Sequence, residues 1–141
     1  MIWKQNIDLK VIHNSLKNTM AEYLDIYVKE IGDEYIKATM PVNYKTIQPF
    51  GILHGGASVV LAETVGSLAS NLCLNDDSYS VGLDINANHI KSVNDGFVTA
   101  TTSPIHIGRS THVWEIKLKQ ANNITCISRL TMAVLKKTVS S

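Results

Sequence analysis

The chain has a single charged residue in the middle of a long uncharged segment. Glu63 is the only Asp, Glu, Lys or Arg between Lys45 and Asp76, and the run from Gly55 to Cys73 around it is mostly apolar. An ionised carboxylate that leaves water without a partner loses several kcal/mol of solvation free energy. Because no Lys or Arg lies within a helical turn or two of Glu63, the leading hypothesis is a chemical role. The alternative is a tolerated carboxylate that only bonds a Ser or Thr hydroxyl.

The segment before Glu63 supplies hydrogen-bonding groups. Gln48 and His54 carry an amide and an imidazole, and Gly55 and Gly56 open a predicted helix with bare backbone N–H groups. A helix N-terminus favours negative charge, because its first N–H groups have no partner within the helix. These groups could stabilise an oxyanion. The alternative is that His54 and the glycines form only a tight turn and a helix cap.

Helical spacing places Ser67 beside Glu63. Residues four apart on a helix share a face, so Ser67 and Val59 lie on the Glu63 side. Small residues at positions 56, 66, 67 and 70 keep that side open. The spacing therefore predicts a face along which a substrate could approach the carboxylate.

The N-terminal elements follow from the hydrophobic pattern. Residues 8–23 predict one or two short helices, with Asp8 and Thr19 as N-caps. Alternation and a turn at Gly32-Asp33 predict a hairpin of two strands, which are Leu24–Lys29 and Tyr35–Val42.

A long helix and further strands follow the hairpin. The helix is predicted from Gly56 to Leu74 and has apolar residues on most sides. Four strand-like runs, predicted as a meander, come next: Tyr79–Ile90, Gly96–Ile107, Thr111–Gln120 and Ile124–Lys136. One long helix can bury most of its surface only if a curved sheet wraps it. The fold class is therefore α+β, with one antiparallel sheet and a surface left for dimerisation.

Composition limits the classes of function. The chain has 141 residues, 45% hydrophobic and 18% charged, with a net charge of +1, as expected for one globular domain over residues 1–141. This balance predicts no nucleic acid and no membrane as partner. The N-terminus lacks a signal-peptide pattern, and Glu63 and several polar residues break the apolar run, so a cytoplasmic protein is expected. Cys73 and Cys126 are expected to be reduced core thiols.

Other motifs point to few further chemistries. His89, His106 and His112 lie on predicted strands without metal-ligand spacing, so no metal site is expected. Ser58 lacks the second glycine of a nucleophile elbow. Basic and hydroxyl residues at two strand ends could bind phosphate or be ordinary turn residues, and these are Lys91-Ser92 and Gly108-Arg109-Ser110.

These residues also carry a family resemblance over essentially the full length. The specific block is Gln48-Pro-Phe-Gly-Ile-Leu-His-Gly-Gly-Ala-Ser58, followed by Leu61-Ala-Glu-Thr-Val-Gly-Ser67. Supporting blocks are Val81-Gly-Leu-Asp-Ile-Asn-Ala-Asn-His89 and His106-Ile-Gly-Arg109. The chain resembles the hotdog-fold acyl-CoA thioesterases, in particular the branch that acts on aromatic acyl thioesters in menaquinone and enterobactin synthesis.

The resemblance implies roles for the residues around the helix start. Glu63 is the catalytic carboxylate, acting as nucleophile or general base. Gln48 and His54 hold the thioester and the attacking water, Gly55 donates its N–H to the thioester oxygen, and Ser67 lines the site. The family's sheet wraps the long helix. Its subunits form homotetramers, as dimers of dimers, with active sites at the dimer interface.

The resemblance also implies where coenzyme A binds as part of the substrate, with no separate cofactor. The relatives carry Arg or another polar residue at the position of Lys91. Lys binds phosphate as a point charge, whereas Arg can make a bidentate contact. The expected contacts are Gly82, His89, Ile90, Lys91, Ser92, His106, Ile107, Gly108, Arg109, Ser110 and Thr111.

The expected function is hydrolysis of an aromatic acyl-CoA, of the 1,4-dihydroxy-2-naphthoyl-CoA or benzoyl-CoA type, to the free acid and coenzyme A. One alternative is a proofreading hydrolase that removes aryl groups misloaded on a carrier protein. Another is a non-catalytic acyl-CoA-binding module. A hotdog hydratase ranks low, because Glu63 has no His on its own helix face. A purely structural oligomer leaves the open face beside Glu63 unexplained.

Overall fold

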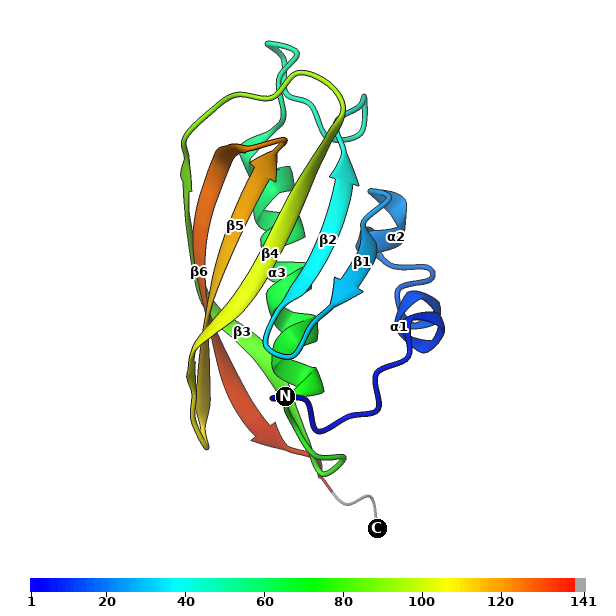
Figure 1. Cartoon of the computed structure of the whole chain (residues 1–141), viewed down its shortest axis with the longest axis vertical. Helices are drawn as coiled ribbons and strands as arrows, with labels where there is room; N and C mark the ends of the chain where they lie inside the picture. Colours follow the sequence, from blue (N-terminus) through cyan, green and yellow to red (C-terminus); the bar gives the residue numbers. More distant parts are fainter. Residues whose placement is uncertain (139–141) are drawn as a thin grey trace.

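The computed structural model describes residues 1–138, which form one antiparallel sheet and three helices (Figure 1). The helices are α1 (Leu9–Ser15), α2 (Met20–Tyr23) and α3 (Gly55–Leu72). The sheet has six strands in the order β1-β2-β4-β5-β6-β3. Their bounds are β1 Tyr27–Ile31, β2 Ile36–Pro41, β3 Ser78–His89, β4 Phe97–Ile107, β5 Thr111–Gln120 and β6 Asn123–Lys136.

The curved sheet wraps α3, as expected for the α+β class. Figure 1 shows α3 running behind β2, β4 and β5, while α1 and α2 lie outside β1. Contacts of α3 reach five strands, β2 to β6. Within the described residues no helix has the length and apolar character needed to span a membrane.

The prediction of a four-strand meander is wrong for its first strand. Of these four strands, only β4, β5 and β6 follow one another as neighbours, whereas β3 lies at the far edge and pairs with β6. The chain crosses the concave face of the sheet as α3 before it enters β3. Strand β3 therefore joins the sheet at the edge opposite to the β1–β2 hairpin, and its outer side has no neighbour within the sheet.

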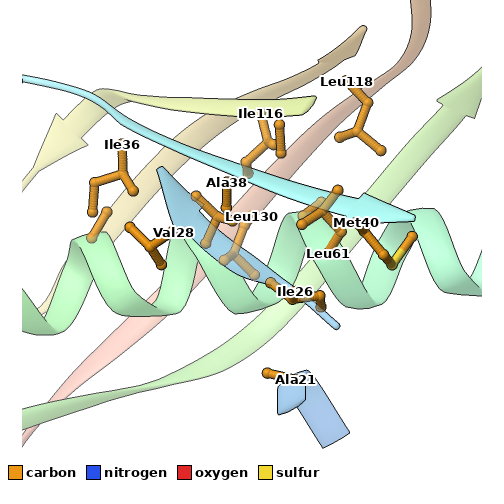
Figure 2. Packing of buried hydrophobic residues seen from close by; sticks show 14 of the residues in the cluster. Ala21, Ile26, Val28, Ile36, Ala38, Met40, Leu61, Ile116, Leu118 and Leu130 are labelled. Atoms are coloured by element: carbon orange, nitrogen blue, oxygen red, sulfur yellow. The ribbon is translucent and has the colours of Figure 1, made fainter. Parts of the chain in front are cut away.

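The core lies between α3 and the concave face of the sheet (Figure 2). Leu61 of α3 and Met40, Ile116 and Leu130 of the strands are all fully buried. Gly66 allows the helix to lie close to the sheet, because a Cβ there would lie 2.6 Å from Leu130 Cδ2. A helix this close to the sheet has only its flanks left for contact with a substrate.

Element boundaries differ from the sequence predictions mainly around the first strand. Leu24 caps α2 instead of starting a strand, and Asp25 adopts a left-handed backbone with φ of 59°. Strand β1 therefore begins only at Tyr27. The turn at Gly32-Asp33 is confirmed, since the Gly32 N–H donates to the Tyr35 carbonyl oxygen at 2.9 Å.

The three helix starts use different caps. Asp8 caps α1 as predicted, because its carboxylate accepts the Lys10 N–H at 2.9 Å. Thr19 is the N-cap residue of α2 as predicted, but its hydroxyl donates to the Leu16 carbonyl oxygen and makes no capping hydrogen bond. Helix α3 begins one residue earlier than predicted, at Gly55, with His54 as its N-cap.

A buried polar network joins the last turns of α3 to β3 and β5. His112 of β5 is 1% exposed, and its Nδ1 lies 2.7 Å from the Ser70 hydroxyl. The Ser80 hydroxyl of β3 donates to Ser70 at 2.8 Å. The Asn71 side chain accepts the Ser80 N–H at 2.9 Å and donates to the Ser80 carbonyl oxygen. The network fixes β3 against α3, as a fully paired buried network can.

Stability should fall in mild acid because of His112. Burial lowers its pKa from 6.5, and the nearby His106 and Lys4 lower it further. Below about pH 6.5 the unfolded chain therefore binds a proton that the folded chain does not, so the free energy of unfolding decreases as the pH falls. We expect the urea midpoint to be lower at pH 5.5 than at pH 7.5. The loss should be smaller in His112→Gln; an equal loss would assign the effect to other groups.

The His54 cap should contribute to stability. Its Nδ1 accepts the Gly56 N–H at 2.8 Å, which satisfies one of the unpaired donors of the first turn. Loss of a side-chain cap costs about 0.5–2 kcal/mol. We expect His54→Ala to lower the free energy of unfolding by about 1 kcal/mol in urea titrations. His54→Asn restores a good capping side chain and should be closer to the parent; equal stability of all three proteins would contradict the capping role.

Candidate functional site

A tight turn presents Gln48. Gly51 has φ of 81°, a left-handed conformation that suits glycine, and its N–H donates to the Gln48 carbonyl oxygen at 2.9 Å. The Gln48 side-chain oxygen accepts the Phe50 N–H. Among the hydrogen bonds of residues 1–138, none involves the side-chain nitrogen of Gln48. Its N–H groups are therefore available to a carbonyl oxygen outside the turn.

The first turn of α3 leaves one backbone donor available. The Gly56 N–H is taken by the His54 ring, and the N–H groups of Ala57 and Ser58 donate to the His54 carbonyl oxygen at 3.0 and 3.2 Å. In the described part of the chain, the Gly55 N–H has no assigned acceptor. The run of free donors expected from the sequence is thus reduced to Gly55, which is the residue that the resemblance selects.

A pocket of about 330 Å³ lies beside the start of α3, and we call it the helix-start pocket. It brings together several residues that the sequence predicts to act on a thioester or on coenzyme A, and the His89 ring lies close against Gly55. The remaining lining residues were not predicted to belong to a site, and these are Ile52, Leu53, Ser58, Val93 and Thr125. The predicted members are Gln48, Gly55, His89, Ile90, Lys91 and Ser92.

Glu63 lies in a different pocket, of about 320 Å³, which we call the Glu63 pocket. Its walls are Met20 of α2 and Val60, Thr64 and Ser67 of α3. In the single chain Glu63 is only partly buried, so its carboxylate has not fully left water. No ion pair involves Glu63 within residues 1–138. The carboxylate is thus unpaired and open to a ligand.

The single chain keeps these two pockets apart. Glu63 follows Gly55 by eight residues, which is about 12 Å along a helix axis. The prediction that Glu63 and Ser67 share a face holds, because both line one pocket. Gln48 and Gly55 line the other pocket and His54 caps the same helix start, so one chain does not place these groups around one reacting atom.

The second predicted coenzyme A stretch, residues 106–111, also lies apart from the first. It runs from the end of β4 through the β4–β5 turn to the first residue of β5, and the Gly108 N–H donates to the Thr111 carbonyl oxygen at 2.8 Å. Thr111 pairs with Ala133 of β6, whereas His89 pairs with Cys126. These two positions are seven residues apart on β6, or about 23 Å. His106 and Arg109 are exposed at this distant turn.

Gly82 lies nearer to Glu63 than to the other predicted coenzyme A contacts. It lies in β3 at a register shift between Gly82 and Asp84, and a Cβ on it would lie 2.5 Å from a Glu63 carboxylate oxygen. The structure therefore associates Gly82 with the Glu63 carboxylate.

Sequence reasoning missed three walls of the Glu63 pocket. Val60 and Thr64 belong to α3 and follow from its helical period around Glu63, whereas Met20 comes from α2 and has no sequence signal linking it to α3. Among the described residues, no group of three or more His, Cys, Asp or Glu side chains is arranged to hold a metal ion.

Curated relatives match nearly the whole chain. A Vibrio cholerae protein that carries only a provisional esterase name is 52% identical, over 94% of this chain and 89% of its own. The 1,4-dihydroxy-2-naphthoyl-CoA hydrolase of Escherichia coli is 46% identical, over 96% of this chain and 100% of its own. The proofreading thioesterase EntH of Cronobacter sakazakii is 43% identical, over 96% of this chain and 99% of its own.

Solved structures and family models agree with these relatives. The crystal structure of a Haemophilus influenzae thioesterase has a TM-score of 0.94 and 47% identity, covering 96% of each chain. The family model of the thioesterase superfamily matches residues 50–127, which include Glu63 and most of the helix-start pocket. The chain therefore belongs to the thioesterase superfamily, has the hotdog fold, and is an enzyme of the thioester-hydrolase class.

Proposed function

We propose that this enzyme hydrolyses aromatic acyl-CoA thioesters with Glu63 as the catalytic carboxylate. The observation that carries the proposal is the Glu63 side chain itself, unpaired within the described chain and partly buried in an open pocket. The free Gly55 N–H and the Gln48 side-chain nitrogen are donors suited to a thioester oxygen. Ser67 lies in the wall beside the carboxylate.

The chemistry needs little beyond a carboxylate and an oxyanion donor. A thiol has a pKa of about 8.5, so the thiolate of coenzyme A leaves without strong acid assistance. The demanding step is attack on the carbonyl carbon. Glu63 either attacks it directly, giving a mixed anhydride that water hydrolyses, or removes a proton from the attacking water. In both routes the Gly55 N–H would stabilise the oxyanion, a contribution of roughly 2.7–4 kcal/mol.

The complete active site in this proposal is shared between two copies of the chain. Strand β3 is 12 residues long and lies at the sheet edge, so its outer backbone groups can pair with a second β3. Two-fold pairing would run the two strands antiparallel. The His89 end of one strand would then meet the Ser78 end of the other. That arrangement would bring turn 106–111 of one copy toward the helix-start pocket of the other.

The same arrangement would bring Glu63 of one copy to Gln48, His54 and Gly55 of the other. It would also place the coenzyme A portion between the two predicted stretches, 89–92 and 106–111. Pairing of two such dimers would give the homotetramer implied by the family.

A reducing, cytoplasmic setting fits Cys73 and Cys126, which are both free and buried.

The acyl group proposed is aromatic, of the 1,4-dihydroxy-2-naphthoyl or benzoyl type. The support is the Escherichia coli relative named for 1,4-dihydroxy-2-naphthoyl-CoA, which would place the enzyme in menaquinone synthesis. The proofreading relative favours a second candidate, removal of misloaded aryl groups from a carrier protein. Both substrates present the same thioester to Glu63. They differ in whether coenzyme A or a carrier protein occupies the surface beyond the pocket.

Glu63→Gln should abolish most turnover of a benzoyl-CoA and naphthoyl-CoA panel while leaving folding and coenzyme A binding intact. The amide can neither attack nor accept a proton, and its size is unchanged. Thiol release can be followed with DTNB, because Cys73 and Cys126 are buried and burial raises the pKa of Cys73 to about 11. Native enzyme alone should therefore react slowly with DTNB.

The matched control is Glu34→Gln, an exposed carboxylate in the β1–β2 turn, which should retain full activity. Near-parental turnover in Glu63→Gln would remove Glu63 from the catalytic role. Acyl-CoA binding without thiol release in the parent enzyme would favour the non-catalytic module. Faster hydrolysis of an aryl thioester on a carrier protein than of the same aryl group on coenzyme A would favour the proofreading function.

Mixing two inactive variants tests the shared site. We expect Glu63→Gln and Gln48→Ala homodimers to have little activity. A mixed dimer would keep one site with both native residues. After unfolding and refolding together in equal amounts, about a quarter of the parental activity should return, because half of the dimers would be mixed and each would hold one intact site of two. No recovery, with mixed dimers shown by mass spectrometry, would place Glu63 and Gln48 in sites within one chain.

A further inference from the structure

We infer that Gly82 is a positioning residue for the Glu63 carboxylate: the space of its missing side chain holds the catalytic oxygen. The inference rests on the proposed function, since it assumes that Glu63 is the group that reacts. It gives Gly82 a role other than contact with coenzyme A.

Backbone conformation does not explain a glycine at position 82. Among the glycines of the described chain, only Gly51 and Gly96 have a positive φ, so Gly82 has a backbone that other residues also adopt. Glycine in a strand weakens it and often marks a bulge or a close approach of another group. Gly82 borders a register shift of β3, which lies between Gly82 and Asp84. The group that approaches Gly82 closely is the Glu63 carboxylate, which occupies the space of the missing side chain.

The neighbours of a side chain at position 82 are few. A Cβ there would lie 2.5 Å from a Glu63 carboxylate oxygen, but 3.5 Å from Glu63 Cδ and 3.9 Å from Leu130 Cδ1, which are ordinary contact distances. Only the carboxylate oxygen would have to move. Because this oxygen ends a flexible side chain, the fold could accept a methyl group at small cost. The displaced atom, however, is the one proposed to react.

The strand itself cannot easily withdraw to make room. Two residues before Gly82, the Ser80 N–H donates to Asn71 Oδ1 at 2.9 Å, and the Ser80 hydroxyl donates to Ser70 at 2.8 Å. Both partners belong to α3, which also carries Glu63. Helix and strand are thus fixed to each other close to the contact. A methyl group at position 82 would therefore move the Glu63 side chain rather than the strand, by about 1 Å.

Gly82→Ala tests the inference by steady-state kinetics. A catalytic group misplaced by about 1 Å can cost about 100-fold in rate. We expect kcat to fall by that order, with KM, inhibition by free coenzyme A and the urea midpoint close to the parent. Asn86→Ala, on the same strand, is the matched control and should keep its activity. A raised KM and weaker coenzyme A inhibition with unchanged kcat would overturn the positioning role and assign Gly82 to substrate contact.

Two further variants test whether Gly82 acts through Glu63. In a Glu63→Gln background Gly82→Ala should cause no further loss, because residues that act as a unit are not additive. In a Glu63→Asp background the shorter side chain leaves room for the methyl group, so the loss caused by Gly82→Ala should be clearly smaller than in the parent. Equal losses in the Glu63→Asp and parental backgrounds would overturn the inference.

A crystal structure of Gly82→Ala separates this inference from the proposed function. A displaced Glu63 side chain with an unmoved β3 supports the inference even if the parent hydrolyses none of the thioesters supplied, in which case the proposed function alone fails. A parent with full thioesterase activity and a Gly82→Ala variant with unchanged Glu63 coordinates and unchanged kcat would overturn the inference alone.

Discussion

Close packing of α3 inside the curved sheet is the constraint on which the rest of this structure depends. Gly66 brings the helix so near to β6 that an added methyl group would meet Leu130. The inward side of α3 is therefore filled by core side chains such as Leu61 and Val65, which are fully buried. Groups of α3 that are open to a ligand can lie only at its start and along its flank. The Gly55 N–H lies at the start, and Glu63 lies on the flank.

The same constraint explains why one chain holds the site in two parts. Along a straight helix Gly55 and Glu63 remain about 12 Å apart, and within residues 1–138 the helix-start pocket and the Glu63 pocket share no lining residue. The neighbours of Glu63 within the described chain are Gly82 of β3 and the pocket wall formed by Met20, Val60, Thr64 and Ser67. A site assembled across a two-fold axis would overcome the separation, and the unpaired edge of β3 provides the means. Catalysis and assembly would then depend on the same strand.

Much of the fold could be predicted from local sequence. Alternating residues and turn signals located β2 to β6 within one or two residues at each end, and the apolar run located α3. The order of strands could not be predicted, because β3 pairs with β6 through contacts between residues such as Ser78 and Lys136 that are far apart in the chain. The start of β1 was missed because Asp25 ends α2 in a left-handed conformation that the hydrophobic pattern does not encode.

The sequence by itself determined the chemistry: a lone carboxylate at position 63, donors at Gln48 and Gly55, and the thioesterase family to which these residues belong. Residue types, helical period and the solvation cost of an unpaired charge are local properties, so they can be predicted from the amino-acid sequence alone. Only the tertiary structure decided the geometry. It divided the predicted site into two pockets, made the His54 ring a helix cap, and set Gly82 against Glu63. The separation of the pockets follows from the rise of α3 between Gly55 and Glu63. The Gly82 contact depends on how close α3 lies to β3, which is fixed by packing and by the Asn71–Ser80 contacts between residues of different elements.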